Sequence, residues 1–162
     1  MKKRLVSCLC ALLCVVMLAV LLPTAAQAAV CKHTYENNVC TACGQIGGTC
    51  GAKLTWTFSP SVGVLAINGT GTMDNYTTDF PAPWYPWREQ VKEVMVGAAV
   101  TSLGTNAFCE CRNLTTINIP NSISNINTSS FLKCDSLETF DLAEKANYVL
   151  DEKGVLYNKK MT

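Results

Sequence analysis

The segment VMVGAAVTSLGTNAFCECRNL at residues 94–114 is repeated in pattern, 23 positions later, by INIPNSISNINTSSFLKCDSL at residues 117–137. Apolar or small residues match at eight positions: Val94/Ile117, Val96/Ile119, Val100/Ile123, Leu103/Ile126, Ala107/Ser130, Phe108/Phe131, Cys111/Cys134 and Leu114/Leu137. Phe140 and Leu142 repeat the first two positions once more. A fixed period in the twenties is typical of a solenoid, in which each unit buries its apolar face by stacking on its neighbours. The sequence therefore predicts a β-rich solenoid with 23-residue repeats.

Each repeat divides into two halves. Residues 114–119 alternate like a strand and end at Pro120, which cannot donate a hydrogen bond to a sheet. The apolar residues of 122–137 are spaced more loosely, which favours bends and short helical turns. Strands of successive repeats are expected to form a parallel sheet. We expect Phe108 and Phe131 to stack inside, with Cys111 and Cys134 in one column beside them.

The N-terminus has the three parts of a secretory signal peptide. Residues 1–4 are basic, residues 5–22 carry no charge, and residues 23–28 end in a small-x-small pattern. This order predicts cleavage after Ala28 and an exported protein. The alternative is a retained membrane anchor, because 18 apolar residues are about the minimum that spans a bilayer.

The predicted mature chain is slightly acidic. Cleavage would leave ten basic and twelve acidic side chains, with no basic cluster. This balance argues against nucleic acid as a partner, and no membrane insertion is expected after cleavage. Seven cysteines would remain, and an odd number does not suit a complete disulfide framework.

The remaining chain divides into three further segments. Residues 29–48 are rich in cysteine and polar residues. Residues 49–90 are predicted to form an N-terminal cap around a β-hairpin with strands at 54–58 and 64–68. Residues 91–162 hold the repeats and a closing hairpin at 148–157, and we interpret the chain as truncated at its C-terminus.

The motifs resemble those of one family, the BspA-like leucine-rich repeat proteins. The matching segments are 48–58, 65–73, Ala82-Pro83-Trp84, the repeats with Ala107-Phe108 and Cys111, and 154–159. The resemblance implies an α/β horseshoe-like leucine-rich-repeat fold and an exported or surface-displayed bacterial protein. Some relatives in this family bind host matrix proteins or other cells. The ligand does not follow from the fold.

A cluster of four metal-ligating residues lies in the cysteine-rich segment. Cys31 and His33 are followed by Cys40 and Cys43, and Gly44 comes next. Thiolates and imidazole suit tetrahedral zinc, and all four ligands would come from protein, so such a site would be structural. The alternatives are one or two disulfides or inert thiols. One structural zinc ion is the cofactor that this pattern allows.

The densest aromatic patch is FPAPWYPW at residues 80–87. Trp84, Tyr85 and Trp87 could stack on sugars or anchor a protein interface. The alternative, which we favour, is that they cover the open N-terminal end of the solenoid.

The repeat strands also predict an exposed column of side chains. These residues alternate with the buried ones: Glu93, Met95, Thr116, Asn118, Thr139 and Asp141. Solenoids usually bind partners on this face, so the column is a candidate binding surface. The alternative, which we weigh at least equally, is an ordinary solvated surface.

Two functions follow from these features. The first is an adhesive module that binds an extracellular protein or glycan through its repeats. The second is a non-binding cap and spacer within a longer surface protein. An enzyme is not expected, because His33 is the lone histidine and no nucleophile motif or phosphate-binding glycine loop is present.

Overall fold

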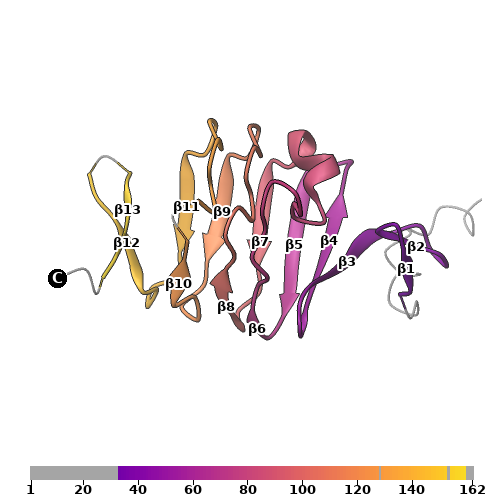
Figure 1. Ribbon diagram of the computed structural model, residues 1–162. Helices are drawn as coiled ribbons and strands as arrows, with labels where there is room; N and C mark the ends of the chain where they lie inside the picture. The colour runs from indigo at the N-terminus through magenta and orange to yellow at the C-terminus, as the bar shows by residue number, and fades with distance from the viewer. Residues whose placement is uncertain (1–32, 128, 153, 160–162) are drawn as a thin grey trace, which may run out of the picture.

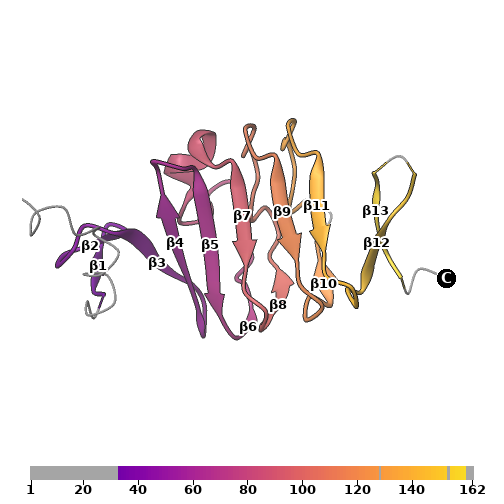
Figure 2. The ribbon, with the colours of Figure 1, turned by 180° about the vertical axis from the view of Figure 1, so that it is seen from behind.

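The computed structural model describes residues 33–127, 129–152 and 154–159 (Figure 1). The predicted signal peptide and Cys31 lie outside these residues. Within the described ranges, no helix is both long enough and apolar enough to cross a membrane. The structure is β-rich with short strands, and its strands stand side by side along one axis (Figures 1 and 2).

The main sheet has eight strands in the order β1-β2-β3-β4-β5-β7-β9-β11. Their bounds are β1 Tyr35–Glu36, β2 Val39–Cys40, β3 Ile46–Gly51, β4 Leu54–Ser59, β5 Val64–Gly69, β7 Glu93–Val96, β9 Thr116–Ile119 and β11 Thr139–Leu142. The first five strands pair antiparallel, and β5, β7, β9 and β11 pair parallel. The change in direction occurs at β5, which therefore joins the N-terminal hairpins to the repeat strands.

The predicted hairpin is present as β4 and β5. Leu54, Trp56 and Phe58 alternate with threonines, and the three apolar side chains are buried. Gly63 closes the turn with a φ of 75°, a conformation that glycine adopts without a steric penalty. The antiparallel pairing also includes β3, which runs across the predicted boundary after residue 48. The cysteine-rich segment is thus continuous with the sheet.

The repeat strands β7, β9 and β11 pair at an offset of 23 residues, whereas β5 pairs with β7 at an offset of 29. Thr116 lies opposite Glu93 on one side and opposite Thr139 on the other. Val94, Ile117 and Ile119 are buried, as the repeat pattern predicts, because their side chains face the interior. The sequence period therefore matches the distance between strand partners.

Three short strands form a second, parallel sheet in the order β10-β8-β6. These are β6 Gly71–Thr72, β8 Val100–Leu103 and β10 Asn125–Ile126. Val100 and Leu103 of β8 are buried and join the core behind the main sheet.

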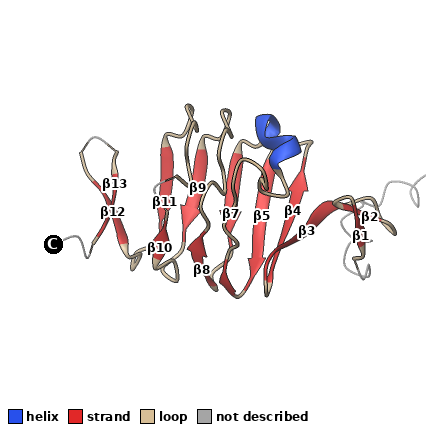
Figure 3. Ribbon diagram, viewed as in Figure 1, coloured by secondary structure: helices blue, strands red, loops and turns tan. Residues whose placement is uncertain are grey.

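The second halves of the repeats, where bends and short helical turns were expected, combine short strands with turns (Figure 3). The described helix is the 3₁₀-helix η1, Tyr85–Gln90, which precedes the repeat strands, and the second half of each repeat has a short strand, β8 or β10, followed by turns. Asn106, Glu110 and Lys133 have φ values of 52°, 63° and 59°. Left-handed residues such as these interrupt helix formation, so the chain reverses direction in short turns.

A row of aromatic rings runs through the core. Trp84 stacks on Phe108 at 5.8 Å, and Phe108 stacks on Phe131 at 5.6 Å, between ring centroids. Trp56 meets Trp84 edge-on at 5.7 Å, and Phe140 meets Phe131 edge-on at 5.6 Å. The predicted Phe108–Phe131 stack is confirmed, and the row connects the hairpin to the repeats.

The chain continues past β11 into a separate antiparallel hairpin. It consists of β12, Tyr148–Leu150, and β13, Leu156–Asn158, with Val149 opposite Tyr157. The hairpin stands at the end of the stack that lies opposite β1 and β2 (Figures 1 and 2). Buried Tyr148 packs against the core from this side.

Candidate functional site

The outward side chains of the main sheet form a continuous surface, which we call the strand face. One row crosses five strands through paired residues, namely Ser59, Val64, Glu93, Thr116 and Thr139. The sequence pattern predicted the part of this row that lies in β7, β9 and β11. The structure adds β4 and β5, because β5 pairs directly with β7.

A second row on the strand face runs parallel to the first. Thr57 pairs with Ala66, and Ala66 pairs with Met95, whose side chain is 53% exposed. Asn118 pairs with Asp141 at the other end. Met95 is therefore an exposed apolar residue at the centre of a polar, mildly acidic surface.

Asn118 differs from the prediction, because its side chain is committed to the backbone of the neighbouring strand. Its Nδ2 donates to the carbonyl of Val96 at 2.9 Å, and its Oδ1 accepts from the N–H of Val96 at 2.5 Å. Registered strand pairs between β7 and β9 are limited to Glu93–Thr116 and Val94–Ile117. The Asn118 amide thus continues the hydrogen bonding between β7 and β9 where their strand pairing stops. Because this half-buried side chain is bonded to Val96, it is not free to contact a ligand.

The aromatic patch is divided by the fold. Trp84, which the sequence proposed for binding, is 1% exposed, and its Nε1 donates to the carbonyl of Ala107 at 2.8 Å. It lies beside Phe108 in the core and cannot stack on a ligand at the surface. A signal was present in the sequence, because Trp84 precedes Phe108 by 24 residues, one more than the repeat length.

Of the other three aromatic residues of the patch, Tyr85 and Trp87 are half-buried and Phe80 is 78% exposed. Trp87 packs against the rings of Trp56 and Phe58 at 5.9 and 6.5 Å. The Tyr85 hydroxyl donates to Oε2 of Glu110 at 2.7 Å, and the Arg88 guanidinium lies 4.1 Å from the Tyr85 ring centre. These rings connect η1 to the hairpin and to the first repeat.

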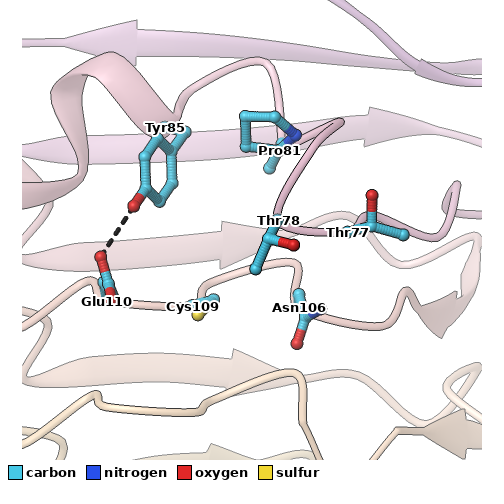
Figure 4. Close-up of a pocket in the computed structure, with 8 residues that line it drawn as sticks. Thr77, Thr78, Pro81, Tyr85, Asn106, Cys109 and Glu110 are labelled. Carbon is cyan, nitrogen blue, oxygen red and sulfur yellow. Dashed lines mark hydrogen bonds between the residues drawn. The ribbon is translucent and has the colours of Figure 1, made fainter.

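A small pocket of about 130 Å³ lies beside this contact (Figure 4). It is lined by Thr77, Thr78, Pro81, Ala82, Tyr85, Asn106, Cys109 and Glu110. Burial and the nearby Glu110 carboxylate raise the pKa of the Cys109 thiol, and the opposing effects of Lys133 and Arg88 are smaller. The thiol therefore stays protonated near neutral pH. The Tyr85 hydroxyl and the Glu110 carboxylate, two of the polar groups in the lining, are hydrogen-bonded to each other.

Glu110 also connects the two repeats. Lys133 Nζ contacts Glu110 Oε1 at 2.5 Å, and Arg88 Nε lies 3.7 Å from Oε2. The hydrogen bond from Lys133, then the one from Tyr85, lower the Glu110 pKa to about 2. Glu110 and Lys133 are 23 residues apart, so opposite charges at one repeat position were the signal that sequence reasoning missed.

Three of the four predicted metal ligands come together at the N-terminal end of the sheet. One ligand atom from each of His33, Cys40 and Cys43 lies within 4.8 Å of the other two. Cys43 Sγ is 3.4 Å from His33 Nδ1. Cys31, the fourth predicted ligand, lies outside the described residues.

The environment of Cys40 favours its thiolate. Burial acts to raise its pKa, but hydrogen bonds from the His33 ring, from the backbone of Ala42 and Cys43 and from the Cys43 thiol outweigh burial. The resulting pKa is about 5. The thiolate is the form of cysteine that binds metal.

Comparison with known proteins identifies the repeats. Residues 85–158 match the family described as BspA type leucine rich repeat region (6 copies). No curated protein matches the chain. A crystal structure of a leucine-rich repeat protein from Eubacterium ventriosum is similar, with 22% sequence identity and a TM-score of 0.42 over 71% of this chain. The match covers 48% of that protein, so this chain corresponds to about half of its length. The repeat region of this chain, residues 85–158, belongs to the BspA type leucine-rich repeat family.

Proposed function

We propose that this chain is an exported bacterial surface protein whose leucine-rich repeats bind an extracellular protein or glycan through the strand face. The observation that carries the proposal is the uninterrupted row from Ser59 to Thr139 across five paired strands. We further interpret the parallel strands as a solenoid with 23-residue repeats, an architecture that commonly presents such an extended binding surface.

The chemistry of the strand face supports a partner with hydrogen-bond donors or positive charge. The described outward positions of β7, β9 and β11 carry the carboxylates Glu93 and Asp141 and no basic side chain. Thr116 and Thr139 supply hydroxyl and methyl groups on the same surface. Exposed Met95 is flexible and polarizable, and it could adapt to an apolar part of the partner.

Export rests on the sequence of the N-terminus. The basic, apolar and small-residue parts of residues 1–28 support a signal peptide that is cleaved after Ala28. We therefore propose a secreted or cell-surface location. The family of the repeats supports the same location.

The environments of the cysteines and the histidine support a binding role without catalysis. Burial raises the pKa of the thiols of Cys111 and Cys134, and a protonated buried thiol is a poor nucleophile. His33, the lone histidine of the sequence, lies in the cysteine cluster, away from those thiols.

A binding panel with matched variants tests the proposal. The full sequence is expressed in a bacterial host that exports it, and the purified product is tested against extracellular-matrix proteins and glycans. Met95→Lys and Asp141→Lys are expected to weaken binding by about tenfold or more, because the first changes the centre of the strand face and the second reverses a charge at its β11 end. Asp141→Lys should act partly through the association rate and the salt dependence.

Leu132→Lys is the control for Met95→Lys. Leu132 is 51% exposed, close to the 53% of Met95, but it lies in a turn and not on the strand face. The control should bind like the unmodified chain. Equal loss in both variants would contradict a site on the strand face. No binding by a chain shown to be folded would favour the spacer function.

A further inference from the structure

A second feature of the molecule lies at the end of the sheet, apart from the strand face. His33 lies two residues before the start of β1, Cys40 ends β2, and Cys43 lies in the turn between β2 and β3. The side chains converge although they come from three different positions of the hairpin. Cys40 is 1% exposed, His33 is half-buried and Cys43 is exposed, so the cluster opens to solvent on one side.

The spacing of the cluster suits a tetrahedral metal. With Zn–S and Zn–N bonds of about 2.3 and 2.0–2.1 Å, a tetrahedral site places a sulfur about 3.6 Å from a nitrogen. The distance from Cys43 Sγ to His33 Nδ1 is 3.4 Å. Thiolate and imidazole are also the ligands that zinc prefers. Only a small movement would place these two atoms around one zinc ion.

The backbone holds the two cysteines in position. The Gly44 N–H donates to the carbonyl of Cys40 at 2.8 Å, and the Cys40 N–H donates to the carbonyl of Gln45 at 2.8 Å. Gly44 has a φ of 74°, which lets the chain reverse direction immediately after Cys43. This tight turn directs both thiols toward His33.

Contacts outside the cluster orient the histidine. The His33 ring stacks on Tyr35, with ring centroids 5.8 Å apart and an interplanar angle of 20°. Tyr35 lies over β3, because a Cβ added at Gly47 would come within 2.9 Å of the Tyr35 hydroxyl. Packing of this kind fixes the orientation of a metal-binding imidazole in the same way as the outer contacts of known metal sites.

We propose that His33, Cys40 and Cys43 bind one structural zinc ion, and that the ion fastens the β1–β2 hairpin to β3. The hairpin covers what would otherwise be an open edge of the main sheet, and exposed edges promote pairing with other chains. Asn38 extends this attachment, because its Nδ2 donates to the carbonyl of Pro83 at 3.3 Å. Zinc thus stabilises the end of the sheet and does not take part in ligand binding on the strand face.

Metal analysis of the exported full chain tests the proposal. We expect about one zinc ion per chain, and titration with Co²⁺ should give the intense visible bands of tetrahedral coordination and a thiolate charge-transfer band. Cys43→Ser should raise the metal dissociation constant by more than about 100-fold, since loss of an outer contact alone costs about 10- to 100-fold.

Cys109→Ser is the matched control, because Cys109 is a half-buried cysteine outside the cluster. It should bind zinc like the unmodified chain. Absence of zinc and cobalt binding by the reduced, folded chain would overturn the proposal, and so would a disulfide at Cys40 or Cys43 in the purified protein.

A measurement on the unmodified chain covers the case in which a variant does not fold. Hydrogen exchange is followed before and after removal of zinc with a chelator. Faster exchange should be confined to the amides of β1, β2 and β3, because the ion acts at that end. Unchanged exchange there after confirmed metal removal would overturn the structural role.

Discussion

The first and second repeats carry similar residues at matching positions, but they bury them to different extents. Phe108 and Cys111 are 0% and 1% exposed, whereas Phe131 and Cys134 are only half-buried. Phe108 lies between two stacked rings, those of Trp84 and Phe131. In a stacked architecture a residue is buried by the units on both sides. Its contribution to the free energy of unfolding therefore depends on the neighbouring units as much as on its own residue type.

The largest expected effect tests this difference directly. Phe108→Ala should lower the free energy of unfolding by about 3–5 kcal/mol, because it leaves a cavity between two rings. Phe131→Ala should cost about half as much, since part of its ring already contacts solvent. Urea denaturation of the exported chain measures both values, and similar m-values would show that the unfolded states are comparable. Equal losses of unfolding free energy in the two variants would mean that burial between neighbouring rings does not set the contribution of each phenylalanine to stability.

The β7–β9 and β9–β11 junctions provide the next comparison. Asn118→Ala should cost about 2 kcal/mol, because it leaves both the N–H and the carbonyl of Val96 without the bonds that the side chain makes. Asp141→Ala, at the paired position on β11, should change stability by less than about 0.5 kcal/mol, because its side chain is exposed. Thermal or urea unfolding of the two variants measures the difference.

Asn118→Asp sharpens the same comparison. Aspartate keeps an acceptor for the Val96 N–H but loses the donor to the Val96 carbonyl. The second carboxylate oxygen would face the Val96 carbonyl, where two acceptors repel, so we expect a stability at or below that of Asn118→Ala. A variant as stable as the unmodified chain would show that the donor contributes nothing.

The smallest expected effect concerns the ion pair that joins the repeats. The Glu110 pKa is about 2 in the folded chain, below its ordinary value of 4.5, chiefly because Lys133 donates a hydrogen bond. A lowered folded-state pKa stabilises the protein above the ordinary value, and this contribution is lost as the pH falls from about 4.5 to 2. Glu110→Gln should remove that part of the pH dependence.

The melting temperatures of the unmodified chain and of Glu110→Gln are measured from about pH 6 to about pH 2. This range runs from above the ordinary pKa of Glu110 down to its value in the folded chain. The curves should differ most at the upper end of this range and converge toward the lower end. A constant difference across the range would contradict a role for the Glu110 charge. Lys133→Gln should reproduce only part of the Glu110→Gln profile, because the hydrogen bond from Tyr85 to Glu110 remains.

Much of the strand arrangement could be predicted because it is encoded locally. Alternation at residues 54–58 places one side of β4 in the core, and the 23-residue period identifies Thr116 and Thr139 as partners. Both patterns report which face of a strand is buried, and this depends on side-chain periodicity. The order of cysteines and histidine likewise predicted a metal cluster, of which three members are adjacent in the structure.

The sequence by itself determined the alternating strands of the hairpin and of the repeats, the shift of 23 residues between the repeat strands, and the residue types available for a zinc site. Only the tertiary structure decided that Trp84 belongs to the core, that the Asn118 side chain bonds to Val96, and that Glu110 meets Lys133. These contacts join residues that are 22 to 24 positions apart in sequence. Local periodicity predicts which face a residue occupies, but the contacts made across that face depend on how neighbouring units pack together.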